Sequence, residues 1–287
     1  MHKILPLIIL TIAAIGTILG TAIFSKPANG KNGQIMQSEA SVSTTAAKNL
    51  SITVTYDNNP CRKKLTTAWG FSCLIRGTEK TILFDTGGDG SILLANMEKL
   101  GINPEKIDLV VLSHIHGDHV GGLHSLLEKN PEVVVYLPKS FPKSFKNDVK
   151  KYGAKVVEVQ EPLKICEGVY STGELGTRIK EQSLTIHTEK GLIVITGCAH
   201  PGIVSIINAA KKVVKDNVLL VMGGFHLVGK NKDEIEKIIT GFRKSGVRYV
   251  GPCHCSGDAA RQLFKKEYCE NFMDVGVGRV ITMNDTK

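Results

Sequence analysis

The stretch Ser113-His-Ile-His-Gly-Asp-His119 follows directly on Asp108-Leu-Val-Val-Leu112, an apolar segment with the composition of a strand buried on both faces. In extended backbone, side chains two positions apart point to the same side. His114 and His116 can therefore share one metal ion. A ligand-rich turn directly after a buried strand is typical of α/β proteins, whose functional residues stand at strand ends.

The second half of this stretch predicts a turn that carries two more ligands. Asp118 and His119 follow a glycine and precede Val120-Gly-Gly-Leu123, where a helix can begin. Such a turn aims a carboxylate oxygen and a further imidazole at a position next to the first one. Three histidines and one aspartate in so short a run suit zinc or iron. A chain with nine histidines rarely gathers three of them in this way by chance.

Three further histidines end apolar segments that we expect to be strands. Each lies in a turn with glycine or proline, and in α/β folds such turns at strand ends assemble the functional site. We therefore predict that these histidines join the cluster at Ser113–His119. They are His200 in Thr196-Gly-Cys-Ala-His-Pro-Gly202, His226 in Met222-Gly-Gly-Phe-His-Leu227 and His254 in Gly251-Pro-Cys-His-Cys255.

The rest of the domain alternates between strand-like and helix-like segments, which predicts an α/β protein with two sheets and helices outside. In the first half strands accompany helices, and the second half repeats the arrangement. Residues 184–188 and 192–196 flank a Glu-Lys-Gly turn and predict a hairpin. The other expected strands are 51–56, 71–75, 81–84, 108–112, 133–137, 156–159, 218–222, 249–250 and 275–282, and the expected helices are 93–100, a lysine-rich helix before residue 156, 202–214, 233–245 and 258–266.

The N-terminal segment predicts a membrane connection. Residues 4–24 are apolar, and a helix of this length spans roughly 30 Å, the thickness of a bilayer core. Residues 1–25 are therefore a signal anchor or a signal peptide, and the length favours an anchor. Residues 26–49 have the composition of a flexible linker, and 50–287 form one domain. We expect a membrane-anchored protein with an extracytoplasmic catalytic domain, or an exported one.

Charge and cysteine content narrow the partners. The net charge is +9, but the lysines are scattered and aromatic residues make up only 6%, which argues against nucleic acid and leaves an anionic small molecule as the expected substrate. The seven cysteines are an odd number in a long chain and do not predict a disulfide scaffold. Three of them stand beside the candidate histidines, so a thiol near a metal is as plausible as a bridge.

The motifs resemble a known family. His114-x-His-x-Asp-His119 is similar to the signature of the metallo-β-lactamase superfamily, and Phe84-Asp-Thr-Gly-Gly88 resembles its first motif. The resemblance runs from about residue 50 to 282 and is strongest to the dihydropteroate-synthase-like subgroup, that of 7,8-dihydropterin-6-methyl-4-(β-D-ribofuranosyl)aminobenzene-5'-phosphate synthase. Its further motifs are Trp69-Gly-Phe-Ser72, Thr172-Gly-Glu-Leu175, Glu181-Gln-Ser-Leu184, Gly197-Cys-Ala-His-Pro-Gly-Ile203, Gly223-Gly-Phe-His-Leu227 and Pro252-Cys-His-Cys255.

The resemblance implies a four-layer αββα sandwich, here preceded by one N-terminal hydrophobic helix, with two metal ions in the cleft between the sheets. It also implies that Asp85 orients the metal-binding loop from behind. Zinc is the expected metal, with iron or manganese as alternatives. Carried over by position, the first metal site consists of His114, His116 and His200, and the second of Asp118, His119 and His254.

One departure from the family pattern concerns the bridge between the metals. The superfamily usually has a bridging aspartate where this chain has Gly223-Gly-Phe-His226. His226 is therefore expected either to bind one metal or to contact the substrate. The loop before the expected hairpin at residues 184–196 carries charged and polar residues that are further candidates for substrate contacts, with an ordinary charged loop as the alternative. They are Glu174, Arg178, Glu181 and Gln182.

Hydrolysis is the chemistry expected of such a site, because a metal pair generates hydroxide near neutral pH and stabilises a developing oxyanion. Asp118 is expected to ligate the metal and to accept the proton of the attacking water. The subgroup name suggests a phosphorylated pterin-type substrate. Two alternatives remain: an iron-dependent oxidoreductase of the persulfide dioxygenase type, and a non-catalytic metal-binding module. The intact set of ligands argues against the second alternative.

Overall fold

The structure is a computed structural model that describes residues 49–286. The predicted signal segment 1–25 and the predicted linker, apart from Asn49, lie outside the described residues. The N-terminal hydrophobic helix and the membrane connection therefore stay predictions. Within the described part of the chain, no helix is both long enough and apolar enough to cross a bilayer.

The first of two sheets has seven strands in the order β13-β1-β2-β3-β4-β5-β6. The strands β3 to β6 run parallel, whereas β1 pairs antiparallel with both β2 and β13. The last strand of the domain therefore returns to the sheet of the first half. The bounds are β1 Ser51–Asp57, β2 Phe71–Arg76, β3 Ile82–Phe84, β4 Leu109–Val111, β5 Val134–Pro138, β6 Lys155–Val159 and β13 Val280–Thr282.

The second sheet has six strands in the order β12-β11-β10-β9-β8-β7. Strands β10, β11 and β12 are parallel, and β9 and β10 form the predicted hairpin. The bounds are β7 Leu163–Cys166, β8 Val169–Ser171, β9 Leu184–Thr188, β10 Gly191–Thr196, β11 Val218–Gly224 and β12 Tyr249–Cys253.

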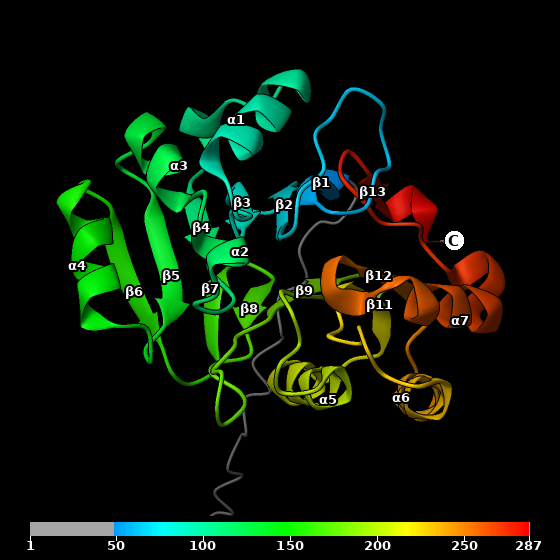
Figure 1. Cartoon of the computed structure of the whole chain (residues 1–287). Helices are drawn as coiled ribbons and strands as arrows, with labels where there is room; N and C mark the ends of the chain where they lie inside the picture. The colour runs from blue at the N-terminus through cyan, green and yellow to red at the C-terminus, as the bar shows by residue number, and fades with distance from the viewer. Residues whose placement is uncertain (1–48, 287) are drawn as a thin grey trace, which may run out of the picture. The chain divides into compact units, whose positions relative to one another are not determined.

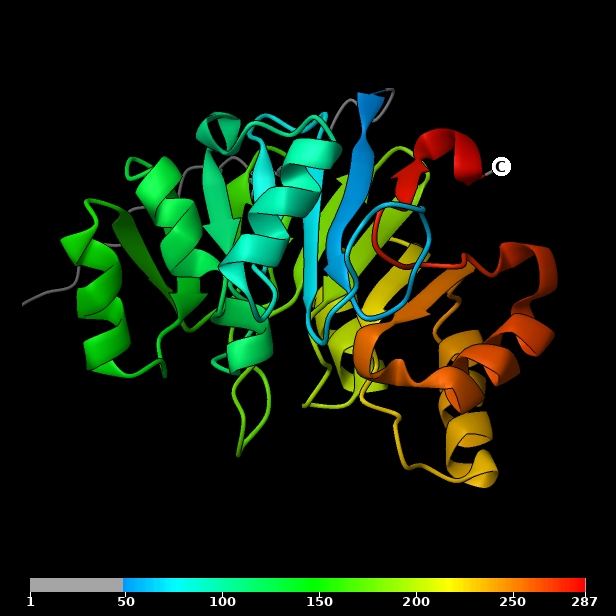
Figure 2. The same ribbon diagram turned by 45° about the horizontal axis from the view of Figure 1, so that its top comes forward.

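The helices cover the outer faces of the two sheets. Figure 1 shows α1, α3 and α4 outside the first sheet and α5, α6 and α7 outside the second. Figure 2 shows the same division, with the cyan and green helices in one half and the yellow to red helices in the other. The bounds are α1 Gly90–Lys99, α2 Gly117–Val120, α3 Leu123–Lys129, α4 Lys143–Lys151, α5 Ile203–Val213, α6 Lys232–Lys244 and α7 Asp258–Tyr268.

Three apolar cores separate these four layers. In β4, Leu109 and Val111 join the core between the sheets, while Val110 and the following Leu112 join the core under α1 and α3. This explains the continuous apolar run of that segment, because alternate residues are buried on opposite faces. A third core lies between the second sheet and its helices. The predicted αββα sandwich is confirmed for the described residues.

Two details differ from the expectation. Strands β7 and β8 were not predicted, because each is short and Gly168, with a φ of 70°, turns the chain between them before an alternating pattern can develop. The expected final strand 275–282 contracts to Val280–Thr282. Gly278 has a φ of 88°, so the chain turns there and cannot continue the strand toward Val275.

The parallel strands bring the predicted site residues to one edge. Asp85 follows β3, and the stretch Ser113–His119 follows β4, with Phe84 paired to Val111. In the second sheet, Thr196 pairs with Gly223, and Gly224 pairs with Cys253, so the ends of β10, β11 and β12 lie level. The carboxyl ends of these strands therefore carry every predicted ligand turn, as the site rule for α/β sheets requires.

One loop of the first half reaches across to the second half. This loop, residues 58–70, connects β1 to β2 and appears in blue beside the red C-terminal segment in Figure 2. Pro60 pairs with Val277, and Asn58 Nδ2 donates a hydrogen bond to the carbonyl of His254 at 3.4 Å. The loop thus helps to place the turn after β12.

Asn96 of α1 holds the loop of residues 58–70 through hydrogen bonds to Thr66 and provides a test of the fold. Its side chain is fully buried, accepts a hydrogen bond from Thr66 N at 2.9 Å and donates to the carbonyls of Thr55 at 3.1 Å and Thr66 at 2.9 Å. We expect Asn96→Ala to lower the free energy of unfolding by about 2–4 kcal/mol, because buried backbone groups lose their partners. Urea unfolding measures this. Glu98→Ala, on the exposed face of α1, should change it by less than about 0.5 kcal/mol, and equal effects of the two variants would contradict the assignment.

Candidate metal centre

The buried carboxylate of Asp85 organises the loop that carries most of the histidines. It accepts hydrogen bonds from Ser113 N at 2.6 Å and from Ser113 Oγ at 2.7 Å, and His119 Nδ1 lies 2.7 Å from Oδ2. Asp85 and His119 are both fully buried. Burial lowers the pKa of His119, but the neighbouring Asp85 carboxylate outweighs burial and raises it. Asp85 thus has the geometry predicted for a residue that orients the metal-binding loop.

Three imidazoles each have an oxygen atom within hydrogen-bond distance of Nδ1. The Nδ1 atom of His119 faces Asp85, that of His114 lies 2.9 Å from Ser113 Oγ, and that of His254 lies 2.9 Å from Asn58 Oδ1. An oxygen acceptor at Nδ1 holds the proton there and leaves the electron pair of Nε2 free. A metal ligand needs this tautomer, so the partners prepare all three rings for coordination.

The first group of ligand atoms comes from both sheets. His114, His116 and His200 offer nitrogens that lie within 4.8 Å of one another, and His114 Nε2 is 3.1 Å from His116 Nδ1. Burial lowers the pKa of His114, and burial together with the charge of His226 lowers that of His200 to about 4. Both rings are therefore neutral near pH 7, the form that binds a metal.

The second group contains four ligand atoms within 4.8 Å of one another, from Asp118, His119, His254 and Cys198. Asp118 Oδ2 lies 3.3 Å from His254 Nε2 and 3.6 Å from His119 Nε2, which in turn lies 3.1 Å from Cys198 Sγ. Burial raises the pKa of Asp118, but the adjacent imidazoles of His254 and His119 outweigh burial and hold the pKa well below its usual range.

These spacings fit divalent metal ions. Metal–nitrogen and metal–sulfur bonds of 2.0–2.3 Å at tetrahedral angles place neighbouring ligand atoms about 3.3–3.5 Å apart, close to the distances in both groups. The Nε2 atom of His200 is buried without a hydrogen-bond partner. A buried polar atom without a partner is costly, and a metal ion bound to it removes the cost. The side chains fall into the two triads that the resemblance implied, and Cys198 joins the second.

Three cysteines lie around the centre, as their positions in the sequence suggested, and all are free. Cys198 and Cys255 are buried with their sulfurs 3.3 Å apart. The hydrogen bond between them lowers the pKa of Cys255 and raises that of Cys198. Cys253 is fully buried in the core between the sheets, and burial raises its pKa. Cys198 was not among the ligands predicted from the sequence.

His226 lies at the rim. Its side chain is exposed, its ring centroid is 4.5 Å from that of His200, and it shares a third possible ligand group with Cys198 and His200. A hydrogen bond with Cys255 raises the pKa of His226. This position allows either metal binding or contact with a substrate, so both interpretations of His226 remain predictions.

Strained backbone marks the ligand turns. Asp85, Ala199, His226 and His254 have φ angles of 56°, 59°, 54° and 46°. Residues with a side chain rarely adopt this left-handed region, at a cost on the order of 1–3 kcal/mol each, and they persist where the surroundings enforce it. Gly197 allows the two halves to meet here, because a Cβ at this position would lie 2.1 Å from Ser113 Oγ and 2.9 Å from Asp85 Oδ2.

Glu181 and Gln182, predicted as substrate contacts, are instead buried residues that hold the ligand turns. Glu181 accepts hydrogen bonds from the backbone N–H groups of Cys198, Ala199 and His200 at 2.8–2.9 Å. Gln182 N donates to Ser113 O at 2.9 Å, and its side chain donates to Leu112 O at 2.9 Å. Two consecutive residues therefore fix one turn from each sheet, and neither side chain is available to a substrate.

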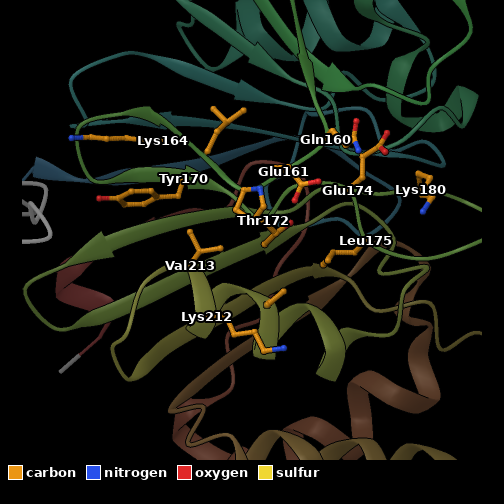
Figure 3. A pocket seen from close by; sticks show the side chains of 13 residues that line it. Gln160, Glu161, Lys164, Tyr170, Thr172, Glu174, Leu175, Lys180, Lys212 and Val213 are labelled. Carbon is orange, nitrogen blue, oxygen red and sulfur yellow. The ribbon is translucent and has the colours of Figure 1, made fainter. Parts of the chain in front are cut away.

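The other two loop residues lie away from the ligands. Glu174 accepts a hydrogen bond from Ser140 N at 2.6 Å and lines a cavity of about 660 Å³. Figure 3 shows Glu174 and Lys180 at one end of this cavity and Tyr170 at the other, and none of its lining residues is a candidate ligand. Arg178 is exposed on the same loop. The structure gives neither Glu174 nor Arg178 a contact with the metal ligands.

A second cavity, of about 420 Å³, opens beside the metal centre. His200 and His226 line it together with Lys230 and the first turn of α5, whose N-terminus has no side-chain cap. On the other side of the centre stands Trp69, the single tryptophan of the chain, which is 54% exposed and has its ring 4.9 Å from that of His254. In the sequence, Trp69 was identified only as part of the motif Trp69-Gly-Phe-Ser72.

The role of Glu181 can be tested through metal affinity. In Glu181→Gln, an amide replaces one of the oxygens that accept backbone N–H groups, so the turn with His200 should lose its position. We expect metal affinity to fall by roughly 10- to 100-fold, as for other residues that support ligands from behind. Competition with a chelator measures this. Glu174→Gln, on the same loop, is the control and should leave the affinity unchanged; equal affinities of the two variants would refute the role of Glu181.

Comparison with known proteins agrees with this geometry. Residues 70–259 match the family model of the metallo-β-lactamase superfamily. A 7,8-dihydropterin-6-methyl-4-(β-D-ribofuranosyl)-aminobenzene-5'-phosphate synthase of Methanocaldococcus jannaschii is 33% identical over 261 residues, which cover 74% of this chain and 89% of the relative. An uncharacterized protein of the same organism is 31% identical over 257 residues, covering 78% of this chain and 97% of the relative.

A solved structure gives the same result. Tm1679, described as a metal-dependent hydrolase of the β-lactamase superfamily, has a TM-score of 0.68 and 30% sequence identity, with 81% of this chain and 98% of that chain covered. The similarity to the pterin-related synthase subgroup, expected from the motifs, is confirmed. By the extent of the family match, the fold and the arrangement of the ligand turns, the chain belongs to the metallo-β-lactamase superfamily.

Proposed function

We propose that this protein is a metal-dependent hydrolase that uses a metal-activated water. The observation that carries the proposal is the adjacency of the two ligand groups, one of three imidazoles and one with the carboxylate of Asp118. Metal ions held by these groups would supply a nucleophilic hydroxide near neutral pH and stabilise negative charge that develops on the substrate. The description of the structurally similar Tm1679 as a hydrolase supports the same chemistry.

Asp118 contributes orientation rather than strong basicity. Its side chain is 22% exposed, so one side faces the ligands and the other is open to solvent. Because its pKa is held well below the usual range, the carboxylate stays ionised and binds a proton weakly. It can therefore accept a hydrogen bond from the attacking water and align it, while His119 and His254 hold its other side.

The surroundings support a substrate with an anionic group and a flat ring. The cavity beside His200 and His226 presents the uncapped N-terminus of α5, which favours an anion such as a phosphate, and is also lined by Lys230, whose ammonium pairs with Glu234 at 3.1 Å. The rest of its lining is mainly apolar. Trp69 offers an exposed aromatic face beside the centre, suited to stacking on a ring. A phosphorylated pterin-type compound combines these features.

A second candidate function follows from the relative that is named a synthase. Its 33% identity over most of this chain favours a reaction on the same class of compound that forms a bond rather than hydrolysing one. The two candidates differ in their products. The metal-loaded protein should be incubated with phosphoester and lactone substrates, and separately with an aminobenzene ribosyl phosphate and a dihydropterin that carries a phosphate-type leaving group on its 6-methyl carbon, followed by mass spectrometry. Release of a water-cleaved product supports the hydrolase, and a joined product together with the released leaving group supports the synthase.

The first metal site can be tested by removing one ligand. We expect His114→Ala to lose about half of the bound metal, because a site of three imidazoles loses one third of its ligands. Turnover of any substrate found in the panel should fall with it. His187→Ala is the control, since His187 is a buried histidine paired with Asp216 and belongs to none of the ligand groups. Elemental analysis that finds equal metal content in both variants would refute the assignment.

His226 separates two roles. If it binds a metal, His226→Ala should lower metal occupancy, and His226→Asp should restore or increase it, because a carboxylate can bridge two ions. If it contacts the substrate, both metals should stay in place and turnover should fall by roughly 10²-fold or more. The control is His124→Ala, an exposed histidine stacked on Tyr152. A His226→Ala variant with unchanged metal content and activity would exclude both roles.

A further inference from the structure

Cys198 is a buried thiol among the metal ligands rather than in an apolar core. Its Sγ lies 3.1 Å from His119 Nε2, and it belongs to the same group of ligand atoms as Asp118 and His254. The imidazole partner is informative, because His119 Nδ1 is already engaged by Asp85. The atom that faces the sulfur is therefore the one with the free electron pair, which is also the atom that would bind a metal.

The contact between Cys198 and His119 has the spacing of two ligands of one metal ion. A thiol can donate its weak S–H to His119 Nε2, but a 3.1 Å separation also matches two ligands of one ion, which lie about 3.5 Å apart at tetrahedral angles. The Nε2 atom of His254 lies 3.3 Å from Asp118 Oδ2. With the proton of His254 held at Nδ1 by Asn58 Oδ1, this contact joins two acceptors; a metal ion between them satisfies both, and a hydrogen bond from Cys198 does not.

The backbone around Cys198 is built to hold its side chain at this place. Glu181 accepts the backbone N–H of Cys198 at 2.9 Å, and Ala199 next to it has a φ of 59°. Gly224 lets the neighbouring thiol pack closely, because a Cβ there would lie 2.7 Å from Cys255 Sγ. The position of Cys198 is therefore determined by the same contacts that position His200.

We propose that Cys198 is the fourth protein ligand of the second metal site, together with Asp118, His119 and His254. This inference rests on the proposed metal centre and goes beyond it, because the family resemblance gave that site only three protein ligands. A divalent ion stabilises the thiolate of the sulfur that it contacts, so Cys198 would be deprotonated when the site is filled.

Two consequences distinguish this arrangement. Four protein ligands close the second site, whereas the three imidazoles of the first site leave a position for water. The first site would then be the one with room for the attacking water. A thiolate also favours zinc or iron over manganese or magnesium, which prefer oxygen ligands. The second site should therefore discriminate against manganese.

Cobalt substitution of the full chain tests the proposal without any substrate. A thiolate bound to cobalt(II) gives an intense charge-transfer band in the near ultraviolet, which imidazole and carboxylate ligands do not give. We expect this band in the native protein and its loss in Cys198→Ser, with affinity for the second cobalt reduced by more than about 100-fold, since loss of a ligand exceeds the effect of a supporting residue. Cys255→Ser is the matched control, a thiol 3.3 Å away that belongs to none of the ligand groups, and should keep the band.

The outcomes that overturn the proposal are distinct. A native protein that binds two cobalt ions without the band, a Cys198→Ser variant that keeps it, or its loss in Cys255→Ser alone each refutes Cys198 as the ligand. Should Cys198→Ser not fold, X-ray absorption of the native zinc protein decides: a sulfur at about 2.3 Å supports the proposal, and nitrogen and oxygen neighbours alone at about 2.0–2.2 Å refute it. If no metal binds at all, the proposed metal centre fails with it.

Discussion

The fully buried carboxylate of Asp85 is the constraint around which the site is built. Its two oxygens take hydrogen bonds from Ser113 N and Oγ and face His119 Nδ1, and Ser113 in turn contacts His114 Nδ1. A buried charge without such partners would be strongly destabilising, so the hydrogen bonds and the carboxylate require one another. Gly197 brings the turn of the second sheet against the same group. The two halves of the sandwich are therefore locked together at the point where the ligands meet.

Hydrogen bonds from buried side chains also explain why the ligand turns keep strained backbone conformations. Glu181 and Gln182 hold a turn from each sheet through backbone hydrogen bonds, so the left-handed φ of Ala199 is enforced by contacts outside it. The rigid setting then offers unequal ligand sets: three imidazoles on one side, and a carboxylate, two imidazoles and the thiol of Cys198 on the other. The first set would leave a metal position open to water, and the second set would hold a metal ion with protein ligands alone.

Much of the architecture was readable from the sequence, and the failures have physical causes. Continuous apolar runs such as Asp108–Leu112 predicted buried parallel strands, and ligand turns at strand ends predicted the clustering of the histidines. The loop residues Glu181 and Gln182 were misplaced because charged or polar character usually indicates exposure, whereas their partners are backbone groups that carry no sequence signal. Cys198 was missed as a ligand for a related reason. The sequence does not distinguish a cysteine buried in an apolar core from a cysteine buried beside an imidazole. The segments before residue 49 lie outside the described residues, and their predictions stand untested.

The central claim, that two metal ions sit side by side in these ligand groups, is tested most directly by a crystal structure recorded at the absorption edge of the bound metal. The account predicts two anomalous peaks about 3.5–4 Å apart, one among His114, His116 and His200 and the other among Asp118, His119, His254 and Cys198. A protein supplied with zinc that shows no peak at these positions, or a single peak elsewhere, would contradict it.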